Sequence, residues 1–187
     1  MNFHFRTNVN AKIGIGHLMR TSKLAKKLKK LGNNCFFYLD NDTKFIKILK
    51  TFKVQYLYNQ GRHFKNQLID ANLFLDRIKD TKGYVVVDDY RLGALWEKKI
   101  SKNNYKIIAF DDLENRKHYS DIYINYKPDF HINSNFKRTN IIKRNCKILL
   151  GPQFSINNYK YKKKNKKKNL LKIVFYTGGG GDLKNIY

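Results

Sequence analysis

The sequence is short of cysteine, of acidic residues and of long apolar runs, and each shortage narrows the class of protein. The two cysteines, Cys35 and Cys146, lie far apart and match no metal-binding spacing, so we expect two reduced thiols in a cytoplasmic protein. No apolar run approaches the length of a membrane-spanning helix, and the first residues lack the apolar segment of a secretory signal. We therefore expect no membrane partner.

The shortage of acidic residues leaves a strong positive charge. The chain has 39 Lys and Arg against 14 Asp and Glu, a formal net charge of +25. Such a balance is typical of proteins that bind nucleic acid or an anionic surface. The excess is mostly lysine spread along expected helix faces, and the densest block, residues 160–168, has neither helical nor strand periodicity. We interpret this block as a solvated linker and expect no specific nucleic acid partner, with an RNA-binding tract as the alternative.

The sequence does have a regular alternation of strand and helix patterns, with 42% hydrophobic residues. Short apolar runs such as 84–87 and 106–110 are typical of buried strands, whereas 18–31 and 64–78 have helical spacing, and a shorter helix is expected over 42–52. This alternation predicts an α/β fold, with a Rossmann-like parallel sheet and helices on both faces. The apolar face expected for the helix over 64–78 consists of Phe64, Leu68, Ala71 and Leu75.

The pattern divides the chain into three expected parts. Residues 1–158 form a Rossmann-like domain, and residues 159–169 form the lysine-rich linker. Residues 170–187 repeat the order of an apolar strand and a glycine loop, as at the start of a second, nucleotide-binding Rossmann-like domain. Because one strand cannot bury both of its faces, we expect the rest of this second domain to be missing from the polypeptide.

Gly14, Gly16, His17 and Arg20 stand where the first strand passes into the first helix. Glycine permits a tight turn close to a ligand, and the helix start offers free N–H groups that favour an anion such as phosphate. The stretch is not a dinucleotide fingerprint, because Met19 replaces the third glycine, and it is not a P-loop. On spacing alone, a plain strand–helix turn with a solvated histidine explains these residues equally well.

Acidic pairs end two of the expected strands: Asp88 and Asp89, followed by Tyr90, and then Asp111 and Asp112. The carboxyl ends of parallel strands meet at one edge of a sheet, where ligands bind. We therefore expect the histidine, the tyrosine and at least one of these acids to converge there. The alternative for each acid is a helix cap or a turn residue, which we expect for one acid of each pair.

Taken in order, these features resemble the nucleotide-sugar hydrolases of pseudaminic acid biosynthesis, which act on UDP-2,4-diacetamido-2,4,6-trideoxy-beta-L-altropyranose. The wider group includes spore-coat polysaccharide proteins and is similar in fold to GT-B glycosyltransferases. The residues that carry the resemblance are spread along the whole chain: Arg6, the element from Gly14 to Arg20, Val87 to Tyr90, Phe110 to Asp112, Leu150 to Pro152 and Gly178 to Asn185.

The resemblance implies an enzyme of two Rossmann-like domains that releases UDP from a nucleotide sugar, in the synthesis of a surface or flagellar glycan. His17 falls on the group's proposed general base, which activates water for attack on the anomeric carbon. The first domain would hold the sugar and the second most of the UDP, with no cofactor and no metal. The implied substrate-binding residues are Arg6, Asn8, Gly14, Gly16, Arg20, Asp88, Tyr90, Asp111 and Asp112, and the implied nucleotide-binding residues are Gly178, Gly179 and Asp182.

Two residues depart from the pattern of this group: Asn8 stands where aspartate is frequent, and Asp89 stands where some members have histidine. Two alternatives stay open. One is half of a GT-B glycosyltransferase, since fold does not fix function. The other is a basic module that binds RNA or another anionic polymer. Because the second domain is expected to be truncated, we expect the isolated chain to bind UDP weakly and to turn over little substrate.

Overall fold

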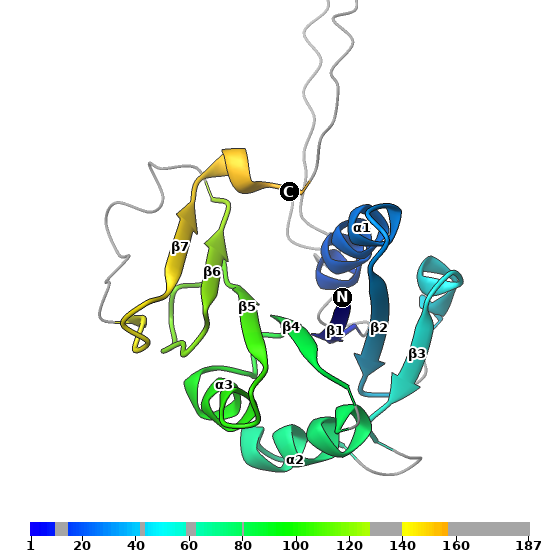
Figure 1. Ribbon diagram of the computed structural model, residues 1–187, viewed down its shortest axis with the longest axis horizontal. Coiled ribbons are helices and arrows are strands. Elements are labelled where there is room, and N and C mark those ends of the chain that lie inside the picture. The colour runs from blue at the N-terminus through cyan, green and yellow to red at the C-terminus, as the bar shows by residue number, and fades with distance from the viewer. Residues whose placement is uncertain (10–14, 42–43, 59–62, 80, 128–139, 157–187) are drawn as a thin grey trace, which may run out of the picture.

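Seven parallel strands form one sheet in the order β3-β2-β1-β4-β5-β6-β7 (Figure 1). The computed structural model describes residues 1–9, 15–41, 44–58, 63–79, 81–127 and 140–156. The strands are β1 (Asn2–Thr7), β2 (Asn34–Leu39), β3 (Lys53–Tyr56), β4 (Gly83–Asp88), β5 (Lys106–Phe110), β6 (Ile122–Asn125) and β7 (Lys147–Leu150). The helices are α1 (Gly16–Lys30), α2 (Gln67–Ile78) and α3 (Ala94–Ser101), with short 3-10 turns at Ile46–Leu49 and Pro152–Phe154.

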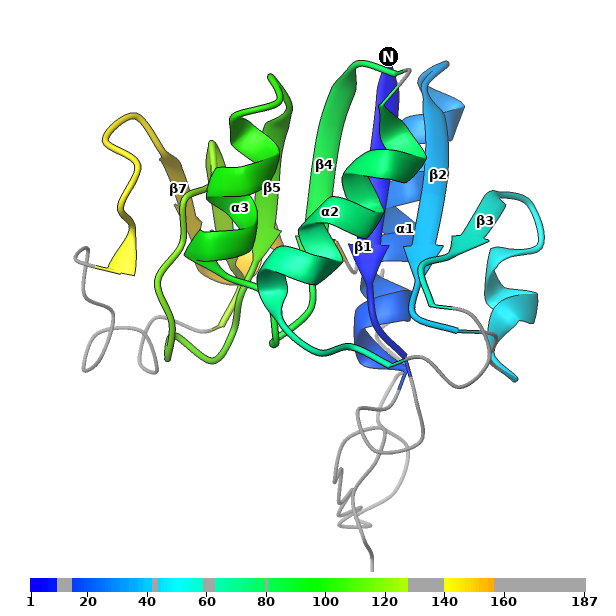
Figure 2. The same ribbon diagram turned by 90° about the horizontal axis from the view of Figure 1, so that it is seen from below.

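Helices cover both faces of the sheet, with α1 on one face and α2 and α3 on the other (Figures 1 and 2). The central strand β4 shows how the sequence produces these two layers. Val86 packs in the cluster that contains the apolar residues of α1, whereas Val85 and Val87 pack in the cluster of α2 and α3. Successive side chains of a strand point to opposite faces, so a continuous run of valines serves both cores. The predicted fold class is confirmed.

The buried side of α2 differs from the predicted one. Ala71, Phe74 and Ile78 are fully buried, but Leu68 is 51% exposed. The reason is Asp70, which is also fully buried and makes an ion pair with Arg6 on β1 at 2.6 Å. A buried carboxylate must face its partner, so this ion pair sets the rotation of the helix and turns Leu68 outward.

The helix expected over 42–52 is a single 3-10 turn at Ile46–Leu49 within the described residues. Leu49 is buried, and Phe45, Ile46 and Ile48 are all packed against the core on the α1 side of the sheet. Apolar residues therefore follow one another directly in this segment, and no side of the turn is left for polar residues. A longer amphipathic helix requires that spacing.

The first turn of α3 is capped by a residue of α2. Gly93, which precedes α3, offers no side chain, and Oε1 of Gln67 instead accepts hydrogen bonds from the Gly93 and Trp96 backbone N–H groups at 3.1 and 3.2 Å. The indole of Trp96 is fully buried, donates to Asp70 at 2.8 Å and packs 5.2 Å from the ring of Phe74. The two helices therefore share one set of polar and apolar contacts.

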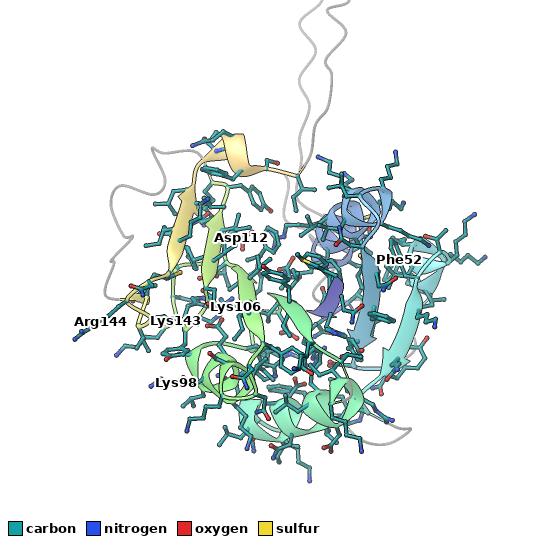
Figure 3. All side chains as sticks on the ribbon, viewed as in Figure 1. Phe52, Lys98, Lys106, Asp112, Lys143 and Arg144 are labelled. Atoms are coloured by element: carbon teal, nitrogen blue, oxygen red, sulfur yellow. The ribbon has the colours of Figure 1, made fainter. Side chains whose placement is uncertain are left out.

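Lys98, Lys106 and Lys143, which Figure 3 labels, make local contacts with acidic or aromatic side chains. Lys106 and Lys143 lie 3.3 and 2.8 Å from the carboxylate of Asp121. Lys98 and Lys143 also lie over the ring of Tyr119, at 5.5 and 5.4 Å from its centroid. The expected linker at 159–169 and the expected second-domain segment at 170–187 lie outside the described residues. The predicted division into domains therefore stays a prediction.

Candidate functional site

The candidate site lies where β1 and β4 run side by side in the middle of the sheet. From β1 the chain passes to α1 on one face, and from β4 it passes to α3 on the other (Figures 1 and 2). The last residues of the two strands, Thr7 and Asp88, are partners in register. In folds of this kind, the carboxyl edge of the sheet between two strands whose connections pass to opposite faces is the usual ligand position.

His17 and Asp88 are in direct contact at this point. His17 lies in the first turn of α1, and its Nδ1 is 2.6 Å from Oδ1 of Asp88. Burial opposes the charge of Asp88, but Arg20 and His17 outweigh it and hold the pKa of Asp88 below its ordinary value. An ionised carboxylate only accepts hydrogen bonds, so Nδ1 of His17 carries a proton, and in the neutral imidazole the lone pair is then on Nε2. Nε2 has no hydrogen-bond partner among the described residues.

Arg20 binds the same carboxylate from the next turn of α1. Its Nε and Nη2 lie 2.7 and 2.6 Å from the two oxygens of Asp88, and Nη1 donates to Tyr126 and reaches Asp112 at 3.4 Å. Burial opposes the charge of Arg20, but Asp88 outweighs it and raises the pKa of the guanidinium above its ordinary value. One cation thus faces two carboxylates. The arrangement leaves no net positive charge for a phosphate.

Tyr90 forms the exposed wall of the site, with 36% of its surface accessible. Its ring contacts His17 edge-on, at 4.4 Å between centroids and 79° between planes, and its hydroxyl donates to Asp112. Burial and the bond to Asp112 raise the pKa of Tyr90, so the hydroxyl stays protonated at neutral pH. The structure therefore brings together the expected histidine, the expected tyrosine and one acid of each pair. We call these residues the His17 cluster: His17, Arg20, Asp88, Tyr90 and Asp112.

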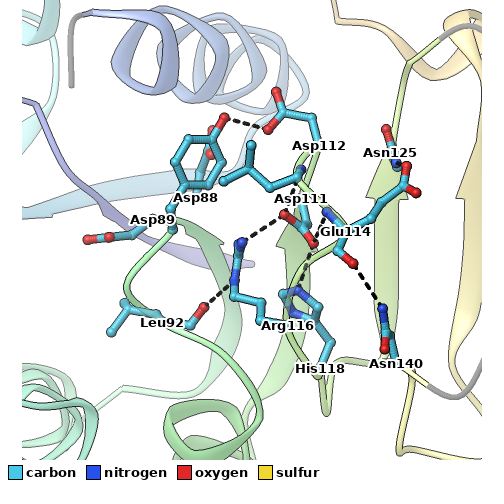
Figure 4. A network of polar contacts seen from close by, with 12 residues as sticks. Asp88, Asp89, Leu92, Asp111, Asp112, Glu114, Arg116, His118, Asn125 and Asn140 are labelled. Atoms are coloured by element: carbon cyan, nitrogen blue, oxygen red, sulfur yellow. Dashed lines mark hydrogen bonds and ion pairs between the residues drawn. The ribbon is translucent and has the colours of Figure 1, made fainter. Parts of the chain in front are cut away.

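The other acid of each pair is a turn residue. Asp89 accepts from the backbone N–H of Arg91 at 3.0 Å, and Asp111 accepts from those of Leu113 and Glu114 at 3.1 and 3.2 Å. Figure 4 shows Asp111 turned away from Asp112 and into the loop that follows β5. The expectation that one acid of each pair serves its turn is confirmed. The substrate-binding role expected for Asp111 has no free carboxylate oxygen to support it.

A second histidine, His118, holds a charged structural network that the sequence pattern did not reveal. Its Nδ1 lies 2.7 Å from Glu97. Its Nε2 lies 3.2 Å from Asp111, which also binds Arg116 at 2.8 Å (Figure 4). Burial opposes the charge of His118, but its two carboxylate partners raise its pKa to about 9. With both ring nitrogens protonated, His118 has no lone pair with which to act as a base.

Arg6 belongs to a buried network on the α2 side of the sheet. The guanidinium is fully buried and binds Asp70 at 3.1 and 2.6 Å and Asp40 at 2.5 Å. Its remaining N–H groups donate to the carbonyl oxygens of Thr7 and Tyr38. All five donors are used within the protein, which leaves none for the substrate contact that the resemblance implied. Asp40 and Asp70 were missed at the sequence level because they lie far from Arg6 along the chain.

The remaining expected site residues lie around the start of α1 or outside the described residues. Gly16 is exposed at the first position of α1, whose start has no side-chain cap and no acidic residue in its first turn. Asn8, which directly follows β1, is 2% exposed, and its Nδ2 has no hydrogen-bond partner among the described residues. The expected residues that the structure does not describe are Gly14, Gly178, Gly179 and Asp182.

The described part of the chain lacks two kinds of feature. None of its helices combines the length and the apolar character needed to cross a bilayer. Within the same residues, no three His, Cys, Asp or Glu side chains are grouped so that they could hold a metal ion.

Comparison with known proteins finds a distant similarity. No protein-family model matches the chain. A curated protein of Methanocaldococcus jannaschii, described as uncharacterized protein MJ1062, is 29% identical over an alignment of 196 positions. The alignment takes in 96% of this chain and 37% of that relative, so the chain spans little more than a third of the relative's length. Because that relative is described as uncharacterized, the similarity assigns no activity to this chain.

Proposed function

We propose that this chain is the histidine-bearing part of an enzyme that hydrolyses a UDP-linked 2,4-diacetamido-2,4,6-trideoxy sugar in pseudaminic acid biosynthesis. The observation that carries the proposal is the contact between Asp88 and Nδ1 of His17. It fixes the tautomer in which Nε2 can accept a proton. The contact lies at the carboxyl edge of a parallel sheet, next to the exposed ring of Tyr90.

In the proposed reaction, Nε2 of His17 takes a proton from a water molecule. The water oxygen forms a bond to the anomeric carbon, and the bond between that carbon and the diphosphate oxygen breaks. UDP leaves with the electron pair, so little acid catalysis is needed. Asp88 then holds the imidazolium that forms, as a carboxylate does behind other catalytic histidines. A positioned base of this kind contributes about 10²–10⁴-fold to the rate.

The charges of the His17 cluster favour a sugar over a phosphate as the group bound there. Arg20 is balanced by Asp88 and Asp112, so a contact of Arg20 with a phosphate has no net positive charge to support it. A neutral sugar hydroxyl can both donate to a carboxylate and accept from a hydroxyl. In this proposal the cluster acts on the sugar, and cations outside it hold the diphosphate.

The decisive experiment incubates the chain with the UDP-linked diacetamido sugar in water enriched in oxygen-18, at enzyme concentrations high enough to measure the low turnover expected of the isolated chain. Attack at the anomeric carbon places the heavy oxygen in the free sugar and none in UDP. His17→Asn keeps an N–H that can donate to Asp88 but lacks Nε2, so we expect turnover to fall about 10²–10⁴-fold. Lys26→Ala, on the exposed side of the same helix, is the matched control and should leave turnover unchanged.

A second readout does not depend on turnover. Addition of the nucleotide sugar should shift the imidazole signals of His17 in NMR spectra, whereas UDP alone should not. Heavy oxygen in UDP, or wild-type turnover in His17→Asn, would contradict the assignment of the base. Transfer of the sugar to a hydroxyl acceptor in preference to water would indicate a glycosyltransferase instead.

A further inference from the structure

Tyr126 contacts the His17 cluster from a strand that carries none of the cluster's members. It directly follows β6, and β5 lies between β6 and β4 in the sheet. Its hydroxyl oxygen accepts a hydrogen bond from Nη1 of Arg20, and the centroid of its ring lies 5.0 Å from Cζ of the same guanidinium. Tyr126 is not among the residues that carry the family resemblance, and the proposed reaction does not use it.

Hydrogen bonds hold the backbone around the point at which Tyr126 leaves the sheet. Asn125 directly precedes Tyr126 and is fully buried. The carbonyl oxygen of Asn125 accepts from the backbone N–H of Gly151 at 2.8 Å, and its side-chain oxygen accepts from that of Lys127 at 3.0 Å. The side-chain amide of Asn125 donates to Glu114. The Tyr126 side chain therefore starts from a fixed point, as a residue that positions another must.

Tyr126 presents a neutral oxygen to Arg20. Burial and the charges of Asp112 and Asp88 outweigh the charge of Arg20 and raise the pKa of Tyr126 above its ordinary value. The hydroxyl is therefore protonated at neutral pH, and its oxygen accepts from Nη1 without adding a negative charge to the cluster. The contact fixes the direction of one N–H group and leaves the charge balance of the cluster unchanged.

The bond to Tyr126 holds Arg20 in place relative to two carboxylates. Nε and Nη2 of Arg20 lie 2.7 and 2.6 Å from the oxygens of Asp88, whereas Nη1 is 3.4 Å from Asp112. A turn of the guanidinium that shortened the contact with Asp112 would lengthen at least one of the bonds to Asp88. Because the Arg20 side chain is only 9% exposed, water does not readily replace a lost acceptor. Tyr126 supplies the acceptor for Nη1 and so preserves the two-point contact with Asp88.

The contact between Arg20 and Asp88 in turn fixes the oxygen that binds His17. Nη2 of Arg20 and Nδ1 of His17 lie at the same distance, 2.6 Å, from the same oxygen, Oδ1 of Asp88. A movement of that oxygen therefore changes the orientation of the imidazole. In enzymes, the displacement of a catalytic group by about 1 Å can cost about 10²-fold in rate.

We propose that Tyr126 is a positioning residue for the base: its hydroxyl keeps Arg20 on Asp88, and Asp88 keeps the imidazole of His17 in one orientation. The inference rests on the proposed function, because it concerns the base of that reaction. It extends that function in two ways. It adds a residue that follows β6, and it gives Arg20 the task of supporting Asp88.

The experiment compares Tyr126→Phe with the natural chain in the hydrolysis assay, at the same high enzyme concentrations. Phenylalanine keeps the ring beside Arg20 and removes only the acceptor for Nη1. We expect kcat to fall about 5- to 50-fold with KM nearly unchanged, which is less than the loss expected without the base. Tyr119→Phe is the matched control and should leave kcat unchanged, because the Tyr119 hydroxyl makes no hydrogen bond with the described residues.

NMR spectra follow the same contacts without turnover. The Nε–H signal of Arg20 and the imidazole signals of His17 should both shift in Tyr126→Phe and remain in place in Tyr119→Phe. The melting temperature of Tyr126→Phe should fall by no more than about 4 °C, the change expected for one hydrogen bond in a chain of this length. An unchanged Arg20 signal, or a rise in KM with kcat unchanged, would overturn the proposal. So would a larger loss of stability, which would show that Tyr126 supports the fold.

The two sets of variants distinguish this inference from the proposed function. If His17→Asn abolishes hydrolysis while Tyr126→Phe keeps the natural kcat, the hydrolase stands and the positioning role is wrong. If Tyr126→Phe shifts the Arg20 and His17 signals while His17→Asn keeps the natural turnover, the contacts through Asp88 are right and the base assignment is wrong.

Discussion

The charge of His118 should make the stability of this fold depend on pH in a defined window. Its pKa is about 9 in the folded protein, against an ordinary value of 6.5 in an unfolded chain. Since the folded value is raised, the stabilising contribution is complete below pH 6.5 and is lost as the pH rises through 9. The difference between these two pKa values corresponds to about 3 kcal/mol of folding free energy. About 2 kcal/mol of this stabilisation is lost between pH 6.5 and 8.5.

This window isolates His118 from two other buried groups. Burial lowers the pKa of His4 to about 4, which destabilises the fold only as the pH falls below about 6.5. Burial raises the pKa of Cys35 to about 11, which adds a further loss only above the range where a free thiol ionises, about pH 8.5. Between these limits, the fall in stability belongs to the network of Glu97, Asp111 and His118.

The assay is denaturant unfolding followed by the fluorescence of Trp96, the single tryptophan and fully buried. The free energy of unfolding, from the midpoint and slope of the transition, should fall by about 2 kcal/mol from pH 6.5 to 8.5. His118→Gln should be less stable at pH 6.5 and nearly independent of pH in this window. The NMR titration of the His118 ring in the natural chain checks the same pKa without a variant. A constant stability, an equal slope in His118→Gln, or a ring that titrates near 6.5 would refute the reasoning.

Two further predictions concern the centre of the sheet. Arg6→Met leaves the carboxylates of Asp40 and Asp70 without their buried cation and should cost about 3–5 kcal/mol in chemical denaturation. Adding Asp70→Asn should recover part of that loss, and strict additivity of the two changes would contradict the ion pair. Gly83→Ala would place a Cβ 2.1 Å from the backbone oxygen of Asn2, so it should separate β4 from β1 and lower the stability by more than about 1 kcal/mol. An unchanged melting temperature would show that the two backbones can move apart without loss.

The alternation of strands and helices could be predicted because each element carries its signal locally. The valine run of β4 and the leucine spacing of α1 need no knowledge of distant residues. The grouping of His17 with Asp88 and Asp112 follows from one further rule, that the carboxyl ends of parallel strands share an edge. These predictions succeeded because the information lies within single segments and in the direction of the strands.

The buried ion pairs could not be predicted, because they join segments far apart in the chain. Arg6 and Asp70 are separated by 64 residues along the chain. Glu97 in α3 and His118, which lies between β5 and β6, are separated by 21 residues. One local signal was available: Asp70 lies beside Ala71 and four residues before Phe74, on what is otherwise an apolar helix face. A carboxylate in that position requires a buried partner. The spacing that included Leu68 fits a helix equally well, so periodicity alone selected the wrong face.

The cap that Gln67 places on α3 makes two helices a single unit of local opening. In most helices the first amides fray independently, but those of Gly93 and Trp96 are held by a side chain of α2. Their exchange with deuterated solvent therefore requires α2 to detach from α3, which also breaks the bond from the Trp96 indole to Asp70. Because Asp70 is itself bound to Arg6 on β1, the unit is fastened to the centre of the sheet. The start of a short, eight-residue helix should accordingly exchange as slowly as the interior of α2, and lose that protection in one cooperative step.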